Sequence, residues 1–314
     1  MSTMLTHHGL TLSEPMVFGL SSSLNFAYLP FVKLAGMPLI AYRSIPKAII
    51  KGLQKNLGVK MRIETFSNVE KGEQRLDELL AEGKIVGAQT SVFWLPYLPD
   101  EMRFHFNGHN LLVYGRDGDT YKISDPVFED VVVADKKEFA KARFAKGVMA
   151  PKGAIYYPIY VPQELDYEQI IPKAIKTVAK RMLNTPVPIA GLKGIRYLAK
   201  SIRKLEKKDR RYARLFLGHI VRMQEEIGTG GAGFRYIYAS FLQESGQLLD
   251  NKILLESSDM MTAVGDSWRE FALMIAKSIR TKKSEVVDFD AIAKKLESIA
   301  DEEAVVYKKL LTAF

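Results

Sequence analysis

A short stretch with the pattern of a tight β-hairpin constrains the fold of this chain most strongly. Two runs with strand character, His109 to Tyr114 and Thr120 to Ser124, flank the dipeptide Asp117-Gly118. That dipeptide suits the left-handed backbone of a tight hairpin turn. A hairpin folded about it brings position 109 opposite 125 or 126. The sequence therefore predicts that an imidazole, His109, lies beside a carboxylate, Asp125, at the open end of one ribbon.

A carboxylate in that position has a defined effect on the histidine. It accepts a hydrogen bond from one ring nitrogen and fixes the tautomer, so that the other nitrogen can act as a base. The pairing thus predicts that His109 is a general base and that Asp125 orients it. A hairpin whose histidine and carboxylate only stabilise each other, or face water, would show the same pattern, and the ribbon alone does not separate these explanations.

The rest of the N-terminal half mixes short strands with amphipathic helices. Alternating apolar residues predict strands at 24–34, 37–42, 59–65, 85–94, 131–133 and 154–159. Apolar spacing and end signals predict helices at 46–57, 69–83 and 136–144. We therefore expect an α+β domain with a mostly antiparallel sheet over residues 1–162.

The pattern changes after Val161-Pro162, and from Asp166 onward it is helical throughout. Helices are predicted at 166–183, 187–206, 208–226, 231–249, 252–280 and 288–312. We expect residues 163–314 to form an all-α domain.

Composition limits the class of protein. The 314 residues suffice for two domains, and a hydrophobic content of 47% is ordinary for a globular chain. No run approaches the 18 apolar residues of a transmembrane helix, and the N-terminus lacks the pattern of a secretory signal, so we expect a cytoplasmic protein. The chain has no cysteine, which excludes disulfides, thiolate metal sites and a cysteine nucleophile within these residues.

The chain is basic, with a formal net charge of +9 and an isoelectric point near 9.4. Such an excess favours an acidic partner: nucleic acid, an anionic membrane or an acidic carrier protein. Basic residues gather in one predicted helical region, which serves either as a docking surface or as a solvated helical face. They are Lys200, Arg203, Lys204, Lys207, Lys208, Arg210, Arg211 and Arg214.

A second motif, Glu225-Glu-Ile-Gly-Thr-Gly-Gly-Ala-Gly-Phe-Arg-Tyr236, places four glycines between two predicted helices. Ordering so many glycines is costly unless the backbone must approach something closely. Free amides at a helix start, with an arginine one turn in, suit an anion or a polarised oxygen. The spacing matches no nucleotide-binding fingerprint, and close helix packing is the alternative explanation. The candidate substrate-binding residues are Gly228, Thr229, Gly230, Gly231 and Arg235.

Five segments together resemble a known family. They are Gly9-Leu-Thr-Leu-Ser-Glu-Pro-Met-Val-Phe-Gly19, Phe93-Trp-Leu-Pro-Tyr97, His105-Phe-Asn-Gly-His-Asn110, Ser124-Asp-Pro126 and Gly228-Thr-Gly-Gly-Ala-Gly-Phe-Arg235. In this combination they look like the butirosin biosynthesis protein H family. Its N-terminal domain is papain-like and is followed by a helical domain of poorly characterised function.

The resemblance implies an acyltransferase with a Cys-His-Asp site that forms an amide. His109 would be the general base, Asp125 its orienter, and Glu14, Tyr97 and Asn107 would contact substrate together with the glycine motif. The acyl group would arrive as a phosphopantetheine thioester on an acidic acyl carrier protein, and a small-molecule amine would accept it. We expect no metal, no other cofactor and no nucleic acid, and the sequence leaves a homo-oligomer open.

The nucleophile is the point at which the sequence departs from the family. The family's cysteine belongs in a His-Cys segment just before the helix that ends here at Gly9, and the chain begins at Met1 inside that helix. We expect a gene start placed too late, at an internal methionine; a member without thiol chemistry is the alternative. Two other functions stay open: a peptidase or amidase with water as acceptor, and a non-catalytic binding module of the same shape.

Overall fold

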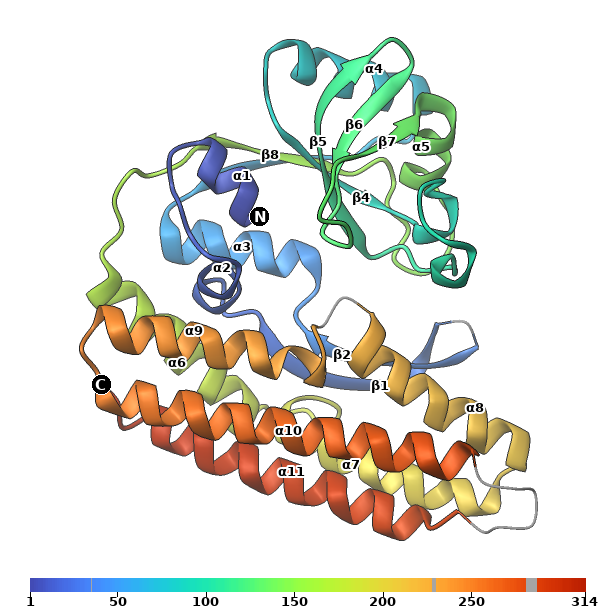
Figure 1. The fold of residues 1–314 in the computed structure, drawn as a ribbon, viewed down its shortest axis with the longest axis vertical. Helices are drawn as coiled ribbons and strands as arrows, with labels where there is room; N and C mark the ends of the chain where they lie inside the picture. The colour runs from blue at the N-terminus through green and yellow to red at the C-terminus, as the bar shows by residue number, and fades with distance from the viewer. Residues whose placement is uncertain (35, 228–229, 281–286) are drawn as a thin grey trace. The chain divides into compact units, whose positions relative to one another are not determined.

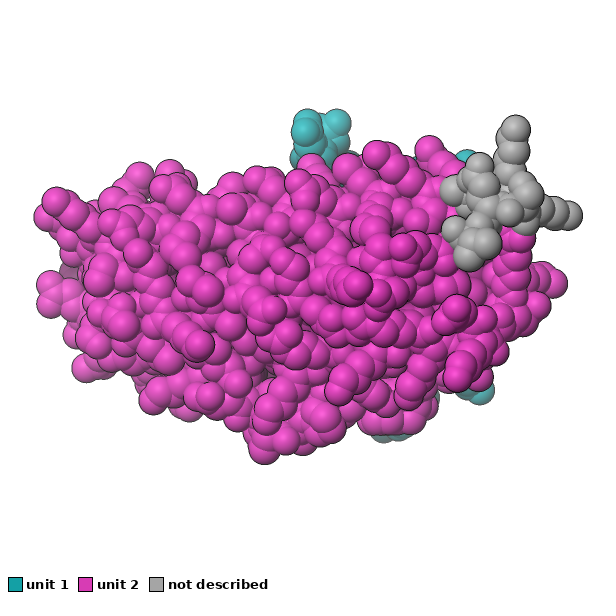
Figure 2. Space-filling model, turned by 90° about the horizontal axis from the view of Figure 1, so that it is seen from below, with its two compact units in different colours: residues 1–11, 58–163 teal, residues 12–57, 164–314 magenta. Residues whose placement is uncertain are grey.

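The computed structural model describes residues 1–34, 36–227, 230–280 and 287–314. The chain divides into two compact units, each described by itself below. The first unit consists of residues 1–11 and 58–163, and the second of residues 12–57 and 164–314. Figure 1 traces the elements in chain order, and Figure 2 colours the two units separately.

The first unit is built on a six-stranded sheet in the order β3-β8-β4-β5-β6-β7. Every neighbouring pair is antiparallel, which confirms the predicted α+β character of this half. The strands are β3 (Lys60–Glu64), β4 (Val86–Thr90), β5 (His109–Asp117), β6 (Thr120–Ser124), β7 (Val132–Asp135) and β8 (Ile155–Tyr160).

Helices cover part of this sheet, and side-chain caps define where two of them begin. Asn68 accepts a hydrogen bond from the Lys71 amide at the start of α4 (Val69–Ala81), and Asp135 accepts one from the Lys137 amide at the start of α5 (Lys136–Arg143). Buried leucines of α4 and a buried phenylalanine of α5 belong to one core with the sheet. The remaining helical elements are α1 (Ser2–His7), η1 (Val92–Trp94) and η2 (Asp100–Met102).

The strand predicted at 85–94 is shorter than expected. β4 ends at Thr90, and the chain turns into η1. The reason lies in the backbone: the Ser91 amide donates to the carbonyl of Ala142, and the Val92 amide to that of Phe106. Since neither carbonyl belongs to a neighbouring strand, the sheet ladder cannot continue past Thr90.

The hairpin of β5 and β6 forms as predicted (Figure 1). Its register differs from the predicted one. Asp117 pairs with Thr120, so the turn residues are 118 and 119, and a bulge between Val113 and Gly115 shifts the pairing by one residue. Leu112 consequently lies opposite Ser124. Continued outward, this register puts position 109 opposite 127, not opposite 125 or 126. Asp125 becomes the diagonal neighbour of His109 on the same face, a distance that long side chains still span.

The second unit is mainly helical, as expected for the C-terminal half. Its helices are α2 (Glu14–Leu20), α3 (Pro46–Leu57), α6 (Tyr167–Asn184), α7 (Gly191–Arg203), α8 (Arg210–Val221), α9 (Arg235–Leu248), α10 (Lys252–Arg280) and α11 (Phe289–Leu310). Short turns η3 (Lys204–Lys207), η4 (Arg222–Glu226) and η5 (Ala232–Phe234) and the ribbon of β1 (Leu24–Leu34) with β2 (Met37–Arg43) complete it. Over the described ranges, no helix combines the length and apolar character needed to cross a bilayer.

The helix predicted at 231–249 begins only at Arg235. The described residues before it, from 230 to 234, all have positive φ, a left-handed backbone that cannot join a right-handed helix. Glycine accepts this conformation without cost, whereas Ala232 and Phe234 are strained by it.

The division into units differs from the predicted boundary in one segment. The border between Gln163 and Glu164 lies close to the expected position, but Leu12–Leu57 belongs to the helical unit. Its contacts are the reason: the Ser13 hydroxyl donates to the Glu244 carboxylate of α9, and the ring of Phe26 stacks on Trp268 of α10. Chain order alone could not assign this segment, because its partners lie more than 200 residues away.

A fully buried ion pair lies in the core of the second unit. Nε of Arg235 donates to Oε1 of Glu303 at 2.9 Å, and the Trp268 indole donates to the same oxygen at 2.7 Å. The Tyr307 hydroxyl donates to Oε2 at 3.0 Å. Burial by itself would lower the pKa of Arg235, but the charge of Glu303 outweighs it and raises that pKa. The carboxylate thus links α9, α10 and α11.

Truncating one partner should show how much the bundle relies on this pair. Replacing Arg235 by alanine leaves the Glu303 carboxylate buried without its cation, which typically costs about 3–5 kcal/mol. We expect a large fall in the unfolding temperature of the second unit, measured by calorimetry. Arg196→Ala is the matched control, because it breaks an exposed pair with Asp301 that is worth about 0–1 kcal/mol. Equal losses in the two variants would contradict a core role for Arg235.

Candidate functional site

The two residues singled out by the hairpin are in direct contact. His109 is the first residue of β5, and Asp125 follows directly after β6. Nε2 of His109 lies 2.7 Å from Oδ2 of Asp125. The carboxylate is fully buried, whereas 13% of the histidine side chain is exposed. The contact expected from the sequence is therefore present, with a buried carboxylate and a partly accessible imidazole.

Three donors converge on the Asp125 carboxylate. Besides His109, the Tyr97 hydroxyl donates to Oδ2 at 2.8 Å, and the Val127 amide donates to Oδ1 at 3.0 Å. Burial acts to raise the pKa of Asp125, but the hydrogen bonds, with that of His109 first, outweigh burial and lower it. Asp125 is consequently ionised at neutral pH and can hold a proton on the imidazole nitrogen that faces it.

This arrangement sets the tautomer of His109. With the proton on Nε2 donated to Asp125, the neutral ring carries its lone pair on Nδ1. Among the described residues Nδ1 has no hydrogen-bond partner. Thr90 of β4 pairs with His109 and fixes its backbone from the other side. An oriented imidazole with one open nitrogen is what general base catalysis requires.

Two more candidate residues lie in the same unit. Tyr97 reaches the pair through Asp125, as described. Asn107 is buried, and its amide donates to the carbonyls of Val148 at 2.9 Å and Lys146 at 3.2 Å. It therefore ties the loop after α5 to the segment before β5. Substrate contact by Tyr97 and Asn107 stays a prediction, and the structure shows a holding role for each.

The remaining candidates belong to the second unit. Glu14 is exposed at the start of α2, and Gly230 is exposed in the glycine motif, while Gly228 and Thr229 lie outside the described residues. Gly231 has φ +85°, and a Cβ added there would meet Nη2 of Arg269 at 2.6 Å. The positive φ by itself accounts for this glycine, since the end of the Arg269 side chain is flexible and could move aside.

Arg235 differs most from its expected position. We predicted a guanidinium turned towards an anion or a polarised oxygen, but the side chain is fully buried and bound to Glu303. Its Nη1 also donates to the carbonyl of Gly233 at 2.7 Å. We predicted substrate binding by Arg235 because it lies one turn into a predicted helix. Its actual partner, Glu303, lies 68 residues further along the chain, so the motif gives no indication of it.

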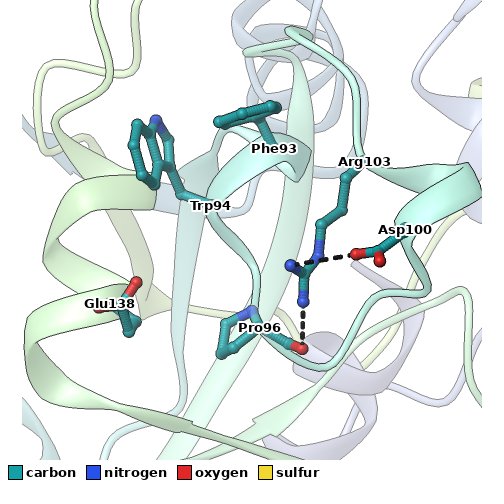
Figure 3. A pocket seen from close by; sticks show the side chains of 6 residues that line it. All are labelled: Phe93, Trp94, Pro96, Asp100, Arg103 and Glu138. Atoms are coloured by element: carbon teal, nitrogen blue, oxygen red, sulfur yellow. Dashed lines mark hydrogen bonds and ion pairs between the residues drawn. The ribbon is translucent and has the colours of Figure 1, made fainter.

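A pocket of about 370 Å³ opens on the first unit. Figure 3 shows the guanidinium of Arg103 next to Pro96 and Asp100, with the rings of Phe93 and Trp94 further away and Glu138 on the opposite side of the pocket. The pocket lies next to the candidate pair along the chain, since Pro96 lines it and the following residue is Tyr97. Sequence reasoning missed Arg103 and Glu138 here, although the aromatic run from Phe93 was a signal. In the described part of the chain, no three histidine or acidic side chains gather as a metal site would require.

The ionisation of Asp125 should be visible in the stability of the protein. Because its folded pKa is lowered, Asp125 contributes stability that is present above its unfolded pKa near 3.8 and is lost as pH falls through the folded value. We expect Asp125→Asn to reduce the free energy of unfolding by about 1–3 kcal/mol at neutral pH. The deficit should shrink below about pH 4, as measured by urea unfolding.

The control for this titration is Asp119→Asn, whose carboxylate is 83% exposed. Its free energy of unfolding should follow that of the unchanged protein across the whole pH range. A deficit in Asp125→Asn that is independent of pH would show that the charge of Asp125 contributes nothing to folding.

Comparisons with known proteins match two families to successive parts of the chain, and the borders of these matches do not follow those of the two compact units. The family described as Butirosin biosynthesis protein H, N-terminal, matches residues 1–126, which include the His109–Asp125 pair. The family described as Domain of unknown function (DUF4872) matches residues 137–310, more than half of the chain. A search of curated proteins finds no match. The chain belongs to the family in which an N-terminal domain of the butirosin biosynthesis protein H type is followed by this C-terminal domain of unknown function.

Proposed function

We propose that the protein is an acyltransferase that moves an acyl group from a carrier-protein thioester to an amine. The observation that carries this proposal is the 2.7 Å contact between His109 and Asp125, with Nδ1 of the imidazole left open. The family match supports an enzyme related to butirosin biosynthesis. A papain-like origin of the first unit is part of the proposal, supported by an antiparallel hairpin that has the histidine at the start of one strand and the carboxylate directly after the other.

The proposed chemistry has two steps. Nδ1 of His109 takes the proton of a thiol, the thiolate attacks the thioester carbonyl, and the carrier's sulfur leaves with a proton from the imidazolium. The amine then attacks the acyl-enzyme, and His109 passes the amine proton to the departing enzyme sulfur. Asp125 stabilises the imidazolium in both steps. Since the 314 residues contain no cysteine, the thiol of this mechanism has to come from outside them.

The charge distribution supports an acidic donor protein. The second unit has 31 Lys and Arg against 21 Asp and Glu, a net charge of +10, whereas the first has 14 against 15, a net charge of −1. The whole basic excess therefore lies in the helical unit. Six basic side chains around η3 are exposed: Lys200, Lys204, Lys207, Lys208, Arg210 and Arg211. We propose that this basic surface attracts the carrier, an attraction that salt should weaken.

The same pair would serve a hydrolase in which water replaces the amine, and the geometry of His109 does not distinguish these acceptors. The test is an assay with a carrier protein bearing a short acyl chain, with and without an amine, on the present chain and on a version extended upstream to include a His-Cys segment. Amide formation by the extended version supports transfer. Free acid formed without amine supports hydrolysis. Neither product from the extended version would contradict both enzyme functions and favour a binding role.

The orienting carboxylate gives the sharpest prediction for activity. Asp125→Asn keeps the size of the side chain but removes the charge that holds the Nε2 proton, a change that costs on the order of 10⁴ in the rate of a serine triad. We expect a loss of similar order in kcat for amide formation by the extended version, with the fold retained by circular dichroism. Asp119→Asn, at the exposed hairpin turn, should keep full activity. Full activity in Asp125→Asn would remove Asp125 from the mechanism.

A further inference from the structure

We propose that Tyr97 is a positioning residue that sets the proton affinity of His109 through the carboxylate they share. The inference rests on the proposed role of His109 as a base, and it is tested below without any activity measurement. Nothing in the sequence motif pointed to this role, since we had expected Tyr97 to contact substrate.

His109 and Tyr97 both form a hydrogen bond to the same carboxylate oxygen of Asp125. Nε2 of His109 lies 2.7 Å from Oδ2, and the Tyr97 hydroxyl donates to the same Oδ2 at 2.8 Å. Within the described part of the chain, the other oxygen, Oδ1, accepts a hydrogen bond only from the backbone amide of Val127, at 3.0 Å. Each donor weakens the acceptor for the other. The tyrosine therefore reduces the stabilisation that Asp125 gives to a protonated imidazole.

Tyr97 is itself held firmly in place. The Arg103 guanidinium donates to the carbonyl of Leu98 at 2.9 Å and to that of Pro96 at 2.5 Å, so it binds the residues on both sides of Tyr97. The tyrosine ring packs edge-on against Phe128, with 5.7 Å between ring centres. Because backbone and ring are both fixed, the hydroxyl is directed at Asp125 without further loss of entropy.

The hydroxyl also stays a donor at working pH. Burial, and after it the neighbouring Asp125 charge, raise the pKa of Tyr97 far above its ordinary value. Other groups around His109 do not supply this effect: β4 contributes the uncharged Thr90, and His105, before β5, stacks on Phe93. Among the described residues, Asp125 and Tyr97 are thus the titratable groups that hydrogen bonds connect to the imidazole.

The test is an NMR titration of the His109 ring in the full chain, with the resonance assigned by its absence from His109→Gln. In Tyr97→Phe, Asp125 keeps its Val127 hydrogen bond and its orientation, and Oδ2 serves the imidazole alone. We expect the proton affinity of His109 to rise roughly tenfold, about one pKa unit. An unchanged or lowered His109 pKa in a folded Tyr97→Phe protein would overturn the proposal.

Tyr121→Phe is the matched control. The Tyr121 hydroxyl also donates to a carboxylate, that of Asp77, at 2.7 Å, and the residue is buried in the same unit. It pairs with Arg116, near the closed end of the hairpin, about 20 Å from His109 at the usual rise per residue. A general loss of stability would affect both variants, but only Tyr97→Phe should move the His109 titration. An equal shift in Tyr121→Phe would also overturn the proposal.

A second measurement covers the case in which Tyr97→Phe does not fold. Replacing Tyr97 alone by a fluorinated tyrosine keeps the ring and makes the hydroxyl a stronger donor. The proton affinity of His109 should then fall, the opposite direction to Tyr97→Phe, and a rise would contradict the proposal. Neither titration needs a thiol, an acyl donor or an amine, so a failed transferase assay and a failed Tyr97 test remain distinguishable.

Discussion

Charges taken out of water must be neutralised where they are buried, and this constraint organises both units. The charge of Asp125 is stable in the interior of the first unit because a histidine, a tyrosine and a backbone amide form hydrogen bonds to the carboxylate. In the second unit Glu303 does the same with Arg235, Trp268 and Tyr307. A carboxylate without such donors would protonate or reach water. Each buried carboxylate thus dictates which elements lie around it.

The two carboxylates nevertheless serve different purposes. All the donors of Glu303 are fully buried, so its network holds helices together and has no group left to act. Asp125 is bound by a histidine that remains partly exposed and keeps one ring nitrogen open. The same physical requirement therefore produces a structural network in one unit and a candidate base in the other. The difference lies in whether a donor has a second functional nitrogen that solvent can reach.

The glycine motif shows why composition does not by itself identify a binding site. Glycine is needed where φ is positive and where a neighbour leaves no room for a Cβ, and both hold at Gly233, where a Cβ would meet the ring of Tyr42 at 2.3 Å. The amino-acid sequence of the motif would be the same whether its backbone packed against a ligand or against a tyrosine side chain. Only the packed neighbour separates the two, and here it is Tyr42 of β2.

The sequence by itself determined what depends on neighbours along the chain. It predicted the hairpin, most helices, the antiparallel α+β half, the helical half and the contact of His109 with Asp125, because periodicity, caps and turn residues act over a few positions. Tertiary structure decided what depends on distant partners. It determined the bulge that makes the histidine and the carboxylate diagonal neighbours, and it placed Leu12–Leu57 with the helices. It also determined that Arg235 pairs with Glu303 and that Tyr97 binds Asp125. These contacts form only when segments far apart in the chain pack together. Local sequence patterns therefore do not indicate which distant residues will be in contact.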